Sequence, residues 1–463
     1  MEIRKYLCGV ALVLSLSTIS ACQTPDLNRL KESSIALLSS DKMPKSKVLP
    51  TLDEEIQSID KLLMNSLADK NSGSDYATII KSAIDGDPSI KLKRLDADAK
   101  WAAVGATEAR KEFQVSGTVY GGIEDVTDGT RGVAVSLNAS RSLFDGGLLD
   151  AEILAKRYAA ESAELGLRAA IDERAFRLGV IWLELEKYQS LKEQIDSRLA
   201  ILDPLIEQLE KVAKAGVGDV SKVTAAQRTV STIRVTQSGI LEGLESARLD
   251  FANAFGSVND DVKYDSEFVV DLIPEQVVEE MAQRSPLILS QYADYNSALA
   301  RVAALRAKDD FNIGFEARAT KPFAGSEYDS DESIGLVARK TLFTGGMIES
   351  EIKEAEALVE AGEARIKATY REGSRTILSA QQNIFSMNKA IELARNNAEL
   401  TEEEIVYLRQ QLIIGGSTLE SVLSAEARLY EAESQEINFT ADKLKSELLI
   451  ASTLGLLGPA LGF

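Results

Sequence analysis

An internal duplication constrains this chain of 463 residues more than any other feature of its sequence. The segment Leu143–Gly147 reads Leu-Phe-Asp-Gly-Gly, and Leu342–Gly346 reads Leu-Phe-Thr-Gly-Gly, at an offset of 199 (342 minus 143). The same offset relates Gly216 to Gly415 (415 minus 216). Self-similarity at one fixed offset marks a structural unit that occurs twice. We therefore expect two similar halves rather than a series of unrelated domains.

The duplication extends upstream of this motif and defines a plan for the chain. Pro88 matches Pro286 at an offset of 198 (286 minus 88), so one residue was gained or lost before the motif. The predicted organisation is a signal peptide at 1–21, an N-terminal linker at 22–75, a first repeat at 76–256, a connector at 257–272, a second repeat at 273–455 and a C-terminal tail at 456–463.

Each repeat shows the same order of expected elements. A proline begins a helix of about 25 residues, because proline suits the first helical turn. Two alternating apolar and polar segments then predict a β-hairpin around a turn, at 124–131 and at 322–332. Heptad spacing predicts a long helix at 148–215 and at 347–414, and a glycine turn leads into a return helix of about 38 residues. Val223–Thr236 is rich in strand-forming residues, but we predict helix there because its repeat partner is plainly helical.

The lengths of these elements restrict the architecture. A helix of about 68 residues is roughly 100 Å long, and two shorter helices placed end to end would line most of it. Four strands cannot close a barrel, since about eight are needed, and an open sheet edge cannot face lipid. If the strands cross a membrane, several chains must pool them.

The composition argues against several classes of protein. There is no histidine, and 72 acidic against 52 basic residues make a net charge of -20. Ser-His-Asp and Cys-His catalysis therefore cannot operate, and the commonest ligand of transition metals is missing. The acid excess opposes nucleic-acid binding. We expect no nucleic-acid partner, no metal site and no cofactor, and a carboxylate-based enzyme of the cell envelope is only a third alternative.

The first residues read as a targeting segment. Arg4 and Lys5 precede an uncharged run, Tyr6 to Ala21, which is shorter than the ~20 residues of a membrane-spanning helix. The run ends in Ile-Ser-Ala followed by Cys22, which resembles a bacterial lipobox. That resemblance implies a cleaved signal peptide and lipidation at Cys22, and an ordinary secretory signal is the alternative.

Each half has the order helix, hairpin, Leu-Phe-x-Gly-Gly junction, long helix, glycine turn and return helix. This duplicated order resembles the TolC family of outer-membrane efflux and secretion channels. The resemblance covers about 76–455 and implies a mainly α fold with β: a homotrimer whose pooled strands form a 12-stranded outer-membrane β-barrel, continued by a periplasmic α-helical barrel. It also implies contact with outer-membrane lipid, and two partners: a periplasmic adaptor (membrane fusion) protein and an inner-membrane transporter, either a proton-driven RND pump or an ATP-driven ABC transporter.

The resemblance also assigns expected roles to particular residues. The barrel-to-helix junction would consist of Phe144, Gly146, Gly147, Phe343, Gly345 and Gly346. The periplasmic tip and adaptor contact would consist of Gly216, Val217, Gly218, Gly415 and Gly416. Some relatives carry tip aspartates six and nine residues after a glycine, where this chain has Ser421 and Ser424. Nearby candidate tip acids are Asp219, Glu420 and Glu426, for which a helix cap or solvated helix charges are the alternative interpretation.

The function expected from this resemblance is an outer-membrane exit duct without enzymatic activity. It would conduct small toxic compounds, or secreted polypeptides as in type I secretion, and would be lipid-anchored in the outer membrane while extending into the periplasm. The alternative is a lipid-tethered periplasmic coiled-coil scaffold, which would leave the amphipathic strands unexplained. The sequence names neither the cargo nor the pump.

Overall fold

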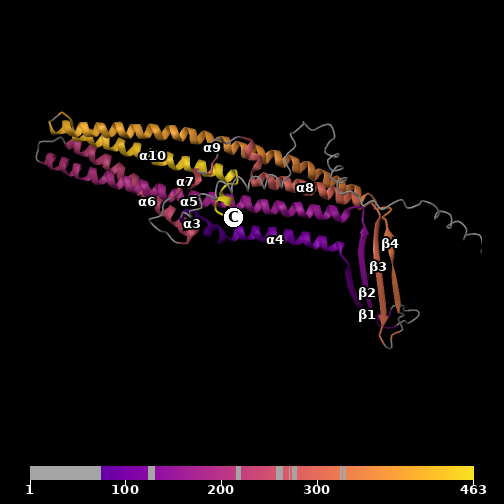
Figure 1. Cartoon of the computed structure of the whole chain (residues 1–463). Coiled ribbons are helices and arrows are strands. Elements are labelled where there is room, and N and C mark those ends of the chain that lie inside the picture. The colour runs from indigo at the N-terminus through magenta and orange to yellow at the C-terminus, as the bar shows by residue number, and fades with distance from the viewer. Residues whose placement is uncertain are drawn as a thin grey trace, which may run out of the picture. The chain divides into compact units, whose positions relative to one another are not determined.

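A computed structural model describes residues 75–123, 131–214, 220–256, 264–270, 272–273, 279–323, 326, 330–414 and 416–463 (Figure 1). The expected signal peptide at 1–21, Cys22 and nearly all of the linker lie outside these residues. The same applies to Gly216, Val217, Gly218, Asp219 and Gly415 at the expected tip.

From Pro88 and from Pro286 onward, the two repeats contain the same α-helices and strands in the same order, and the first has an additional short 3-10 helix, η1. The first comprises α4 (Pro88–Glu108), η1 (Ala109–Lys111), β1 (Gln114–Ile123), β2 (Arg131–Phe144), α5 (Leu148–Lys214) and α6 (Val220–Phe255). The second comprises α8 (Pro286–Ala307), β3 (Asn312–Pro322), β4 (Asp331–Arg339), α9 (Met347–Ile413) and α10 (Leu419–Thr453). The remaining described elements are α3 (Asp75–Asp85), α7 (Ser266–Val270), η2 (Glu279–Arg284) and α11 (Leu457–Ala460). The prediction of helix across Val223–Thr236 is confirmed, since α6 contains this segment.

The long helices are lined by shorter ones, as the lengths predicted. Helices α4 and α6 both pack against α5, while α8 and α10 both pack against α9 (Figure 1). Helix α5 also contacts α8 and α10, so the two repeats meet along it. Helices α5 and α9 have 67 residues each, which corresponds to roughly 100 Å at 1.5 Å per residue.

The four strands form one antiparallel sheet in the order β1-β2-β3-β4. The hairpin of each repeat supplies two neighbouring strands, and β2 pairs with β3 across the repeats, for example Leu137 with Ala319. The strands are 9 to 14 residues long. No helix of the described ranges combines the length and the apolar run that would cross a membrane.

The largest hydrophobic core lies where α3, α5, α6, α10 and α11 meet. Trp182 of α5 packs edge-on against Tyr76 and Phe251, with ring centroids 4.9 and 5.3 Å apart. Leu457 and Leu461 at the end of the chain are buried in the same core. Residues 456–463, expected as a tail, are therefore part of the packed structure.

Candidate functional site

The two faces of the sheet differ in chemistry. The strand register places Val115 beside Ala139, and Leu336 beside Phe315, on one face. Several apolar side chains of this face are exposed in the single chain, Val115 to 71% and Leu336 to 68%. The opposite face carries mainly polar or charged residues: Gln114, Ser116, Thr118, Ser136, Asn138, Ser140, Glu316, Arg318, Thr320, Ser333 and Arg339. Exposed apolar side chains on one face and polar ones on the other are typical of a membrane barrel wall.

The sheet has two open edges among the described residues. Strand β1 pairs only with β2, and β4 only with β3. An unpaired row of backbone N–H and C=O groups is a template for another strand. The edges can therefore accept strands from neighbouring copies of the chain.

The junction between sheet and helices rests on the duplicated glycine pair. Gly146 and Gly147 have φ of 66° and 87°, and Gly345 and Gly346 have φ of 65° and 86°. Residues with a side chain rarely adopt this left-handed region, which explains the Gly-Gly signature. In the first repeat, Asp145 adds a cap by accepting hydrogen bonds from the backbone N–H of Gly147 and of Leu149, each 3.0 Å long.

Exposed aromatic side chains flank this junction. Phe144 lies at the end of β2 and Phe343 follows β4, and they are 54% and 87% exposed. Aromatic residues form belts at the two interfaces of membrane barrels, where one side of the ring meets lipid and the other meets water. The placement of Phe144 and Phe343 fits such a belt.

At the opposite end of the long helices, the described residues include part of the predicted tip. The backbone N–H of Gly416 donates to the carbonyl of Gln411 at 2.9 Å, and Thr418 caps α10 by accepting from the N–H of Ser421. Glu420 lies in the first turn of α10 and is half-buried. An acidic group in this position interacts favourably with the helix dipole.

The sequence suggested that Glu426 is either an acid lining the tip or a solvated helix charge, and its surroundings in the structure match neither. It is only 1% exposed, so the interpretation as a solvated charge is wrong. Its carboxylate accepts hydrogen bonds from Arg198 of α5 at 2.7 Å and from Arg409 of α9 at 2.6 Å. Arg198 also binds Glu433 at 2.7 Å. Glu426 thus ties α5, α9 and α10 together near the tip instead of lying free.

Sequence reasoning missed a second apolar line along α9. Its members, spaced seven or eight residues apart, are all more than half exposed: Leu378, Phe385, Leu393, Leu400 and Tyr407. This spacing places them on one helix face. The buried heptad of α9, which includes Ile405, packs against α10, and the exposed line points away from that contact. A search for two parallel heptad lines in one helix could have found it.

The described residues contain no group of His, Cys, Asp and Glu side chains that could hold a metal ion.

The comparisons with known proteins agree with this geometry. Residues 277–456 match the family model described as outer membrane efflux protein. The chain is 21% identical to the outer membrane protein TolC of Vibrio cholerae over 404 residues, 83% of this chain and 91% of that protein. TolC of Escherichia coli is 23% identical over 150 residues, 32% of this chain, and that match spans only 30% of the Escherichia coli protein.

Solved structures have the same fold. A crystal structure of CusC, described in terms of transmembrane channel formation, superposes with a TM-score of 0.70 at 17% identity, covering 82% of this chain and 91% of that one. The shared fold consists of two helix–hairpin–helix repeats. The second repeat thus matches the family of outer membrane efflux proteins, and most of the chain is similar to the outer membrane protein TolC of Vibrio cholerae.

Proposed function

We propose that three copies of this chain form an outer-membrane exit duct of a tripartite export system. The observation that carries this proposal is the sheet, which has an exposed apolar face, a polar face and two open edges. Three sheets of four strands would make twelve strands, above the minimum of about eight for a closed barrel. The strand lengths suit a membrane that needs about 9–11 residues per tilted strand.

The exposed apolar line of α9 supports association of copies in a ring. Helix α5 has neighbours on both sides, whereas α9 packs mainly against α8 and α10. The helices that line α5 also carry exposed apolar side chains, namely Leu92 and Leu95 on α4 and Val235 and Leu249 on α6. The free side of α9 in one copy would therefore pack against α4 and α6 of the next, and three such contacts would close the ring.

The proposal includes roles for particular residues. The glycine junctions would turn the chain between barrel and helices, while Gly216, Val217, Gly218, Gly415 and Gly416 would form the periplasmic tip. Ile413 and Ile414, exposed to 85% and 82% beside this turn, would offer apolar surface to a periplasmic adaptor protein. Glu420 and Asp219 are the acids proposed to line the tip, because Glu426 is held by two arginines.

The duct would be passive and would have no enzymatic activity. An inner-membrane RND or ABC transporter would supply the energy, and the cargo would be small toxic compounds or secreted polypeptides. Cys22 is proposed as the lipid anchor, which radiolabelled palmitate would test: the parent chain should incorporate label and Cys22→Ala should not. An unlabelled parent would remove the anchor from the proposal.

The duct itself is tested by reconstituting the purified protein into planar bilayers and measuring its mass in non-ionic detergent. We expect a trimer and discrete single-channel conductance steps. A monomer without conductance would favour the alternative, a lipid-tethered periplasmic scaffold. As a matched pair, Leu336→Arg on the apolar face of β4 should abolish insertion, whereas Ser333→Arg on the polar face should not.

A further inference from the structure

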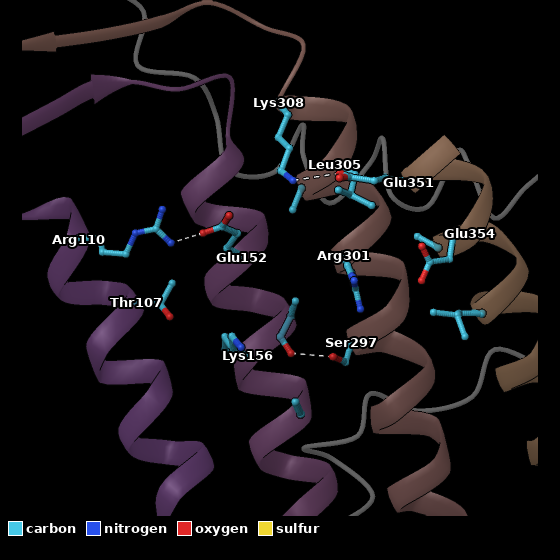
Figure 2. A pocket seen from close by; sticks show the side chains of 15 residues that line it. Thr107, Arg110, Glu152, Lys156, Ser297, Arg301, Leu305, Lys308, Glu351 and Glu354 are labelled. Atoms are coloured by element: carbon cyan, nitrogen blue, oxygen red, sulfur yellow. Dashed lines mark hydrogen bonds and ion pairs between the residues drawn. The ribbon is translucent and has the colours of Figure 1, made fainter. Parts of the chain in front are cut away.

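A cavity lies beside the junction, on the helical side of the sheet. Its volume is about 730 Å³, and α4, α5, α8 and α9 each contribute to its lining (Figure 2). Arg110 and Lys308 lie at its rim, a few residues before β1 and β3 begin. Pockets of roughly 300–1,000 Å³ are the usual size for drug-sized ligands.

Small side chains make the floor of this cavity. Ala155 and Ala159 of α5, Ala304 of α8 and Ala355 of α9 line it, together with the apolar Leu305. Short side chains allow the helices to approach closely and leave room above them. The floor can therefore accommodate the apolar body of a ligand.

Two ion pairs at the rim occur once in each repeat. Arg110 of η1 pairs with Glu152 of α5, and Lys308, just after α8, pairs with Glu351 of α9 at 3.2 Å (Figure 2). The positions are equivalent, since 308 minus 110 is 198 and 351 minus 152 is 199. Both pairs join the first helix of a repeat to its long helix, so they have a structural role that was duplicated with the fold.

Two further cations in the lining do not follow the duplication. Lys156 of α5 and Arg301 of α8 make no hydrogen bond or ion pair with any residue that the structure describes. Their equivalents are Ala355 (156 plus 199) and Ala103 (301 minus 198), so the other repeat does without the charge. Figure 2 shows Lys156 and Arg301 on neighbouring helices, where the two repeats meet.

We propose that this cavity binds organic anions, meaning molecules with a carboxylate or phosphate group on an apolar body. Lys156 and Arg301 would hold the anionic group, and the alanine floor with Leu305 would hold the apolar part. Both cations can exchange water for an acceptor without breaking an existing pair. A guanidinium and an ammonium group together match the oxygens of a carboxylate or phosphate.

One acidic side chain of the lining would repel an anion, and its position determines which side of the cavity is cationic. Glu354 also has no partner among the described residues, and it lies on α9, across α8 from Lys156 (Figure 2). After the two rim pairs are matched, two cations and one carboxylate remain. The cationic side of the cavity therefore lies over α5 and α8, whereas the chain as a whole has a net charge of -20.

The inference rests on the proposed duct. In the proposed ring of copies, the helix face that carries the cavity would be the inner one. Three such cavities would then line the duct just below the barrel. Binding at exposed charges is weak, which suits a site that a passing solute must enter and leave.

The test uses the purified full-length protein and two dyes of similar size and opposite charge. Carboxyfluorescein is the anionic probe, and a rhodamine ethyl ester is its cationic counterpart. Fluorescence anisotropy should show that carboxyfluorescein binds about tenfold more weakly to Lys156→Gln/Arg301→Gln than to the parent. The charge-preserving exchange Lys156→Arg/Arg301→Lys should stay within about threefold of the parent.

Lys353→Gln/Arg371→Gln is the matched control, because it makes the same change in charge on α9 at two exposed residues outside the lining. It should bind carboxyfluorescein like the parent, and rhodamine binding should not weaken in any variant. If all variants bind carboxyfluorescein with equal affinity while the protein conducts in bilayers, the proposed anion site is wrong. The proposed duct would then still stand. A protein that binds the dye but never conducts would overturn the duct and, with it, a role of the cavity in transport.

Discussion

The two repeats match closely at the junction and differ at the other end of the long helices. At the junction the glycine pairs adopt the same φ values within a degree, 66° and 87° against 65° and 86°. Near the tip, Glu426 of the second repeat is buried between two arginines, while its equivalent Gln227 (426 minus 199) is exposed and donates to Glu210 at 2.8 Å. The two repeats therefore share the backbone conformation at the junction, whereas the side-chain contacts near the tip differ between them.

This difference reflects what each end contacts. At the junction, both hairpins enter one sheet with one register, so both repeats must deliver their strands in the same geometry. Near the tip, α5 lies between the repeats, whereas α9 packs mainly against its own two neighbours. Because α5 and α9 contact different helices near the tip, equivalent positions of the two repeats can hold different side chains. Arg198 of the first repeat, for example, pairs with Glu426 of the second.

The largest effect should come from removing both partners of Glu426. Arg198→Ala/Arg409→Ala leaves a buried carboxylate without a cation, and breaking a buried ion pair costs about 3–5 kcal/mol. The midpoint of thermal unfolding, followed by circular dichroism, should fall strongly. Gln227→Ala, at the equivalent exposed position, should change it little. Equal losses in the two variants would remove the asymmetry between the repeats.

A second large effect concerns Asp172, whose equivalent in the other repeat is the exposed Arg371 (172 plus 199). Burial raises the pKa of Asp172 to about 7, although hydrogen bonds from the backbone N–H of Gly458 and Leu457, and the charge of Arg168, lower it. The folded state then binds more protons than the unfolded state between about pH 4 and pH 7. Stability should fall as pH rises through this window, by up to about 4 kcal/mol.

Asp172→Asn tests this expectation, because an amide oxygen still accepts the bond from Gly458, which is 2.9 Å long. The variant should lose the decline between about pH 4 and pH 7 and should be more stable than the parent at about pH 8. Thermal unfolding of both proteins across this range measures it. A parent whose stability does not fall would contradict a neutral buried carboxyl.

A smaller difference should separate the two glycine junctions. Gly345→Ala forces a side chain into the left-handed region and should cost about 1–2 kcal/mol. Gly146→Ala adds a clash, since its Cβ would lie 2.6 Å from Cβ of Asp310, so it should cost more. Equal unfolding midpoints for the two variants would show that Asp310 moves aside without cost.

The smallest effect should come from a surface ion pair in which the acidic and the basic residue exchange positions between the two repeats. Glu108 pairs with Arg157 at 3.3 Å in the first repeat, and at the equivalent positions Arg306 pairs with Glu356 at 2.8 Å. Glu108→Arg alone should cost at most about 1 kcal/mol, because exposed pairs contribute little. Adding Arg157→Glu should restore the loss in a double-mutant cycle. No coupling between the two substitutions would show that the pair is only a surface contact.

The sequence predicts the elements of this fold well, because each has a local signal. The glycine pairs, the proline helix starts and the alternating strands all predicted structure near where it occurs. Glu426 could not be interpreted in this way, since its partner Arg198 is 228 residues away in the chain. The exposed line of α9 was missed for a different reason: its heptad spacing is that of a packed helix, and only the structure shows which line is covered.

The packing of the chain end has a consequence for how the protein is made. Leu457 and Leu461 complete a core that begins with Tyr76 and Ile80, so Tyr76 and Ile80 are synthesised long before these two partners. The backbone N–H of Gly458 donates a hydrogen bond to Oδ1 of Asp172, which is buried in the first repeat to 1% exposure. The core around α3 is therefore incomplete until Leu457 and Leu461 have left the ribosome. A chain truncated before Leu457 would expose apolar surface in its first half, where quality-control proteases could recognise it.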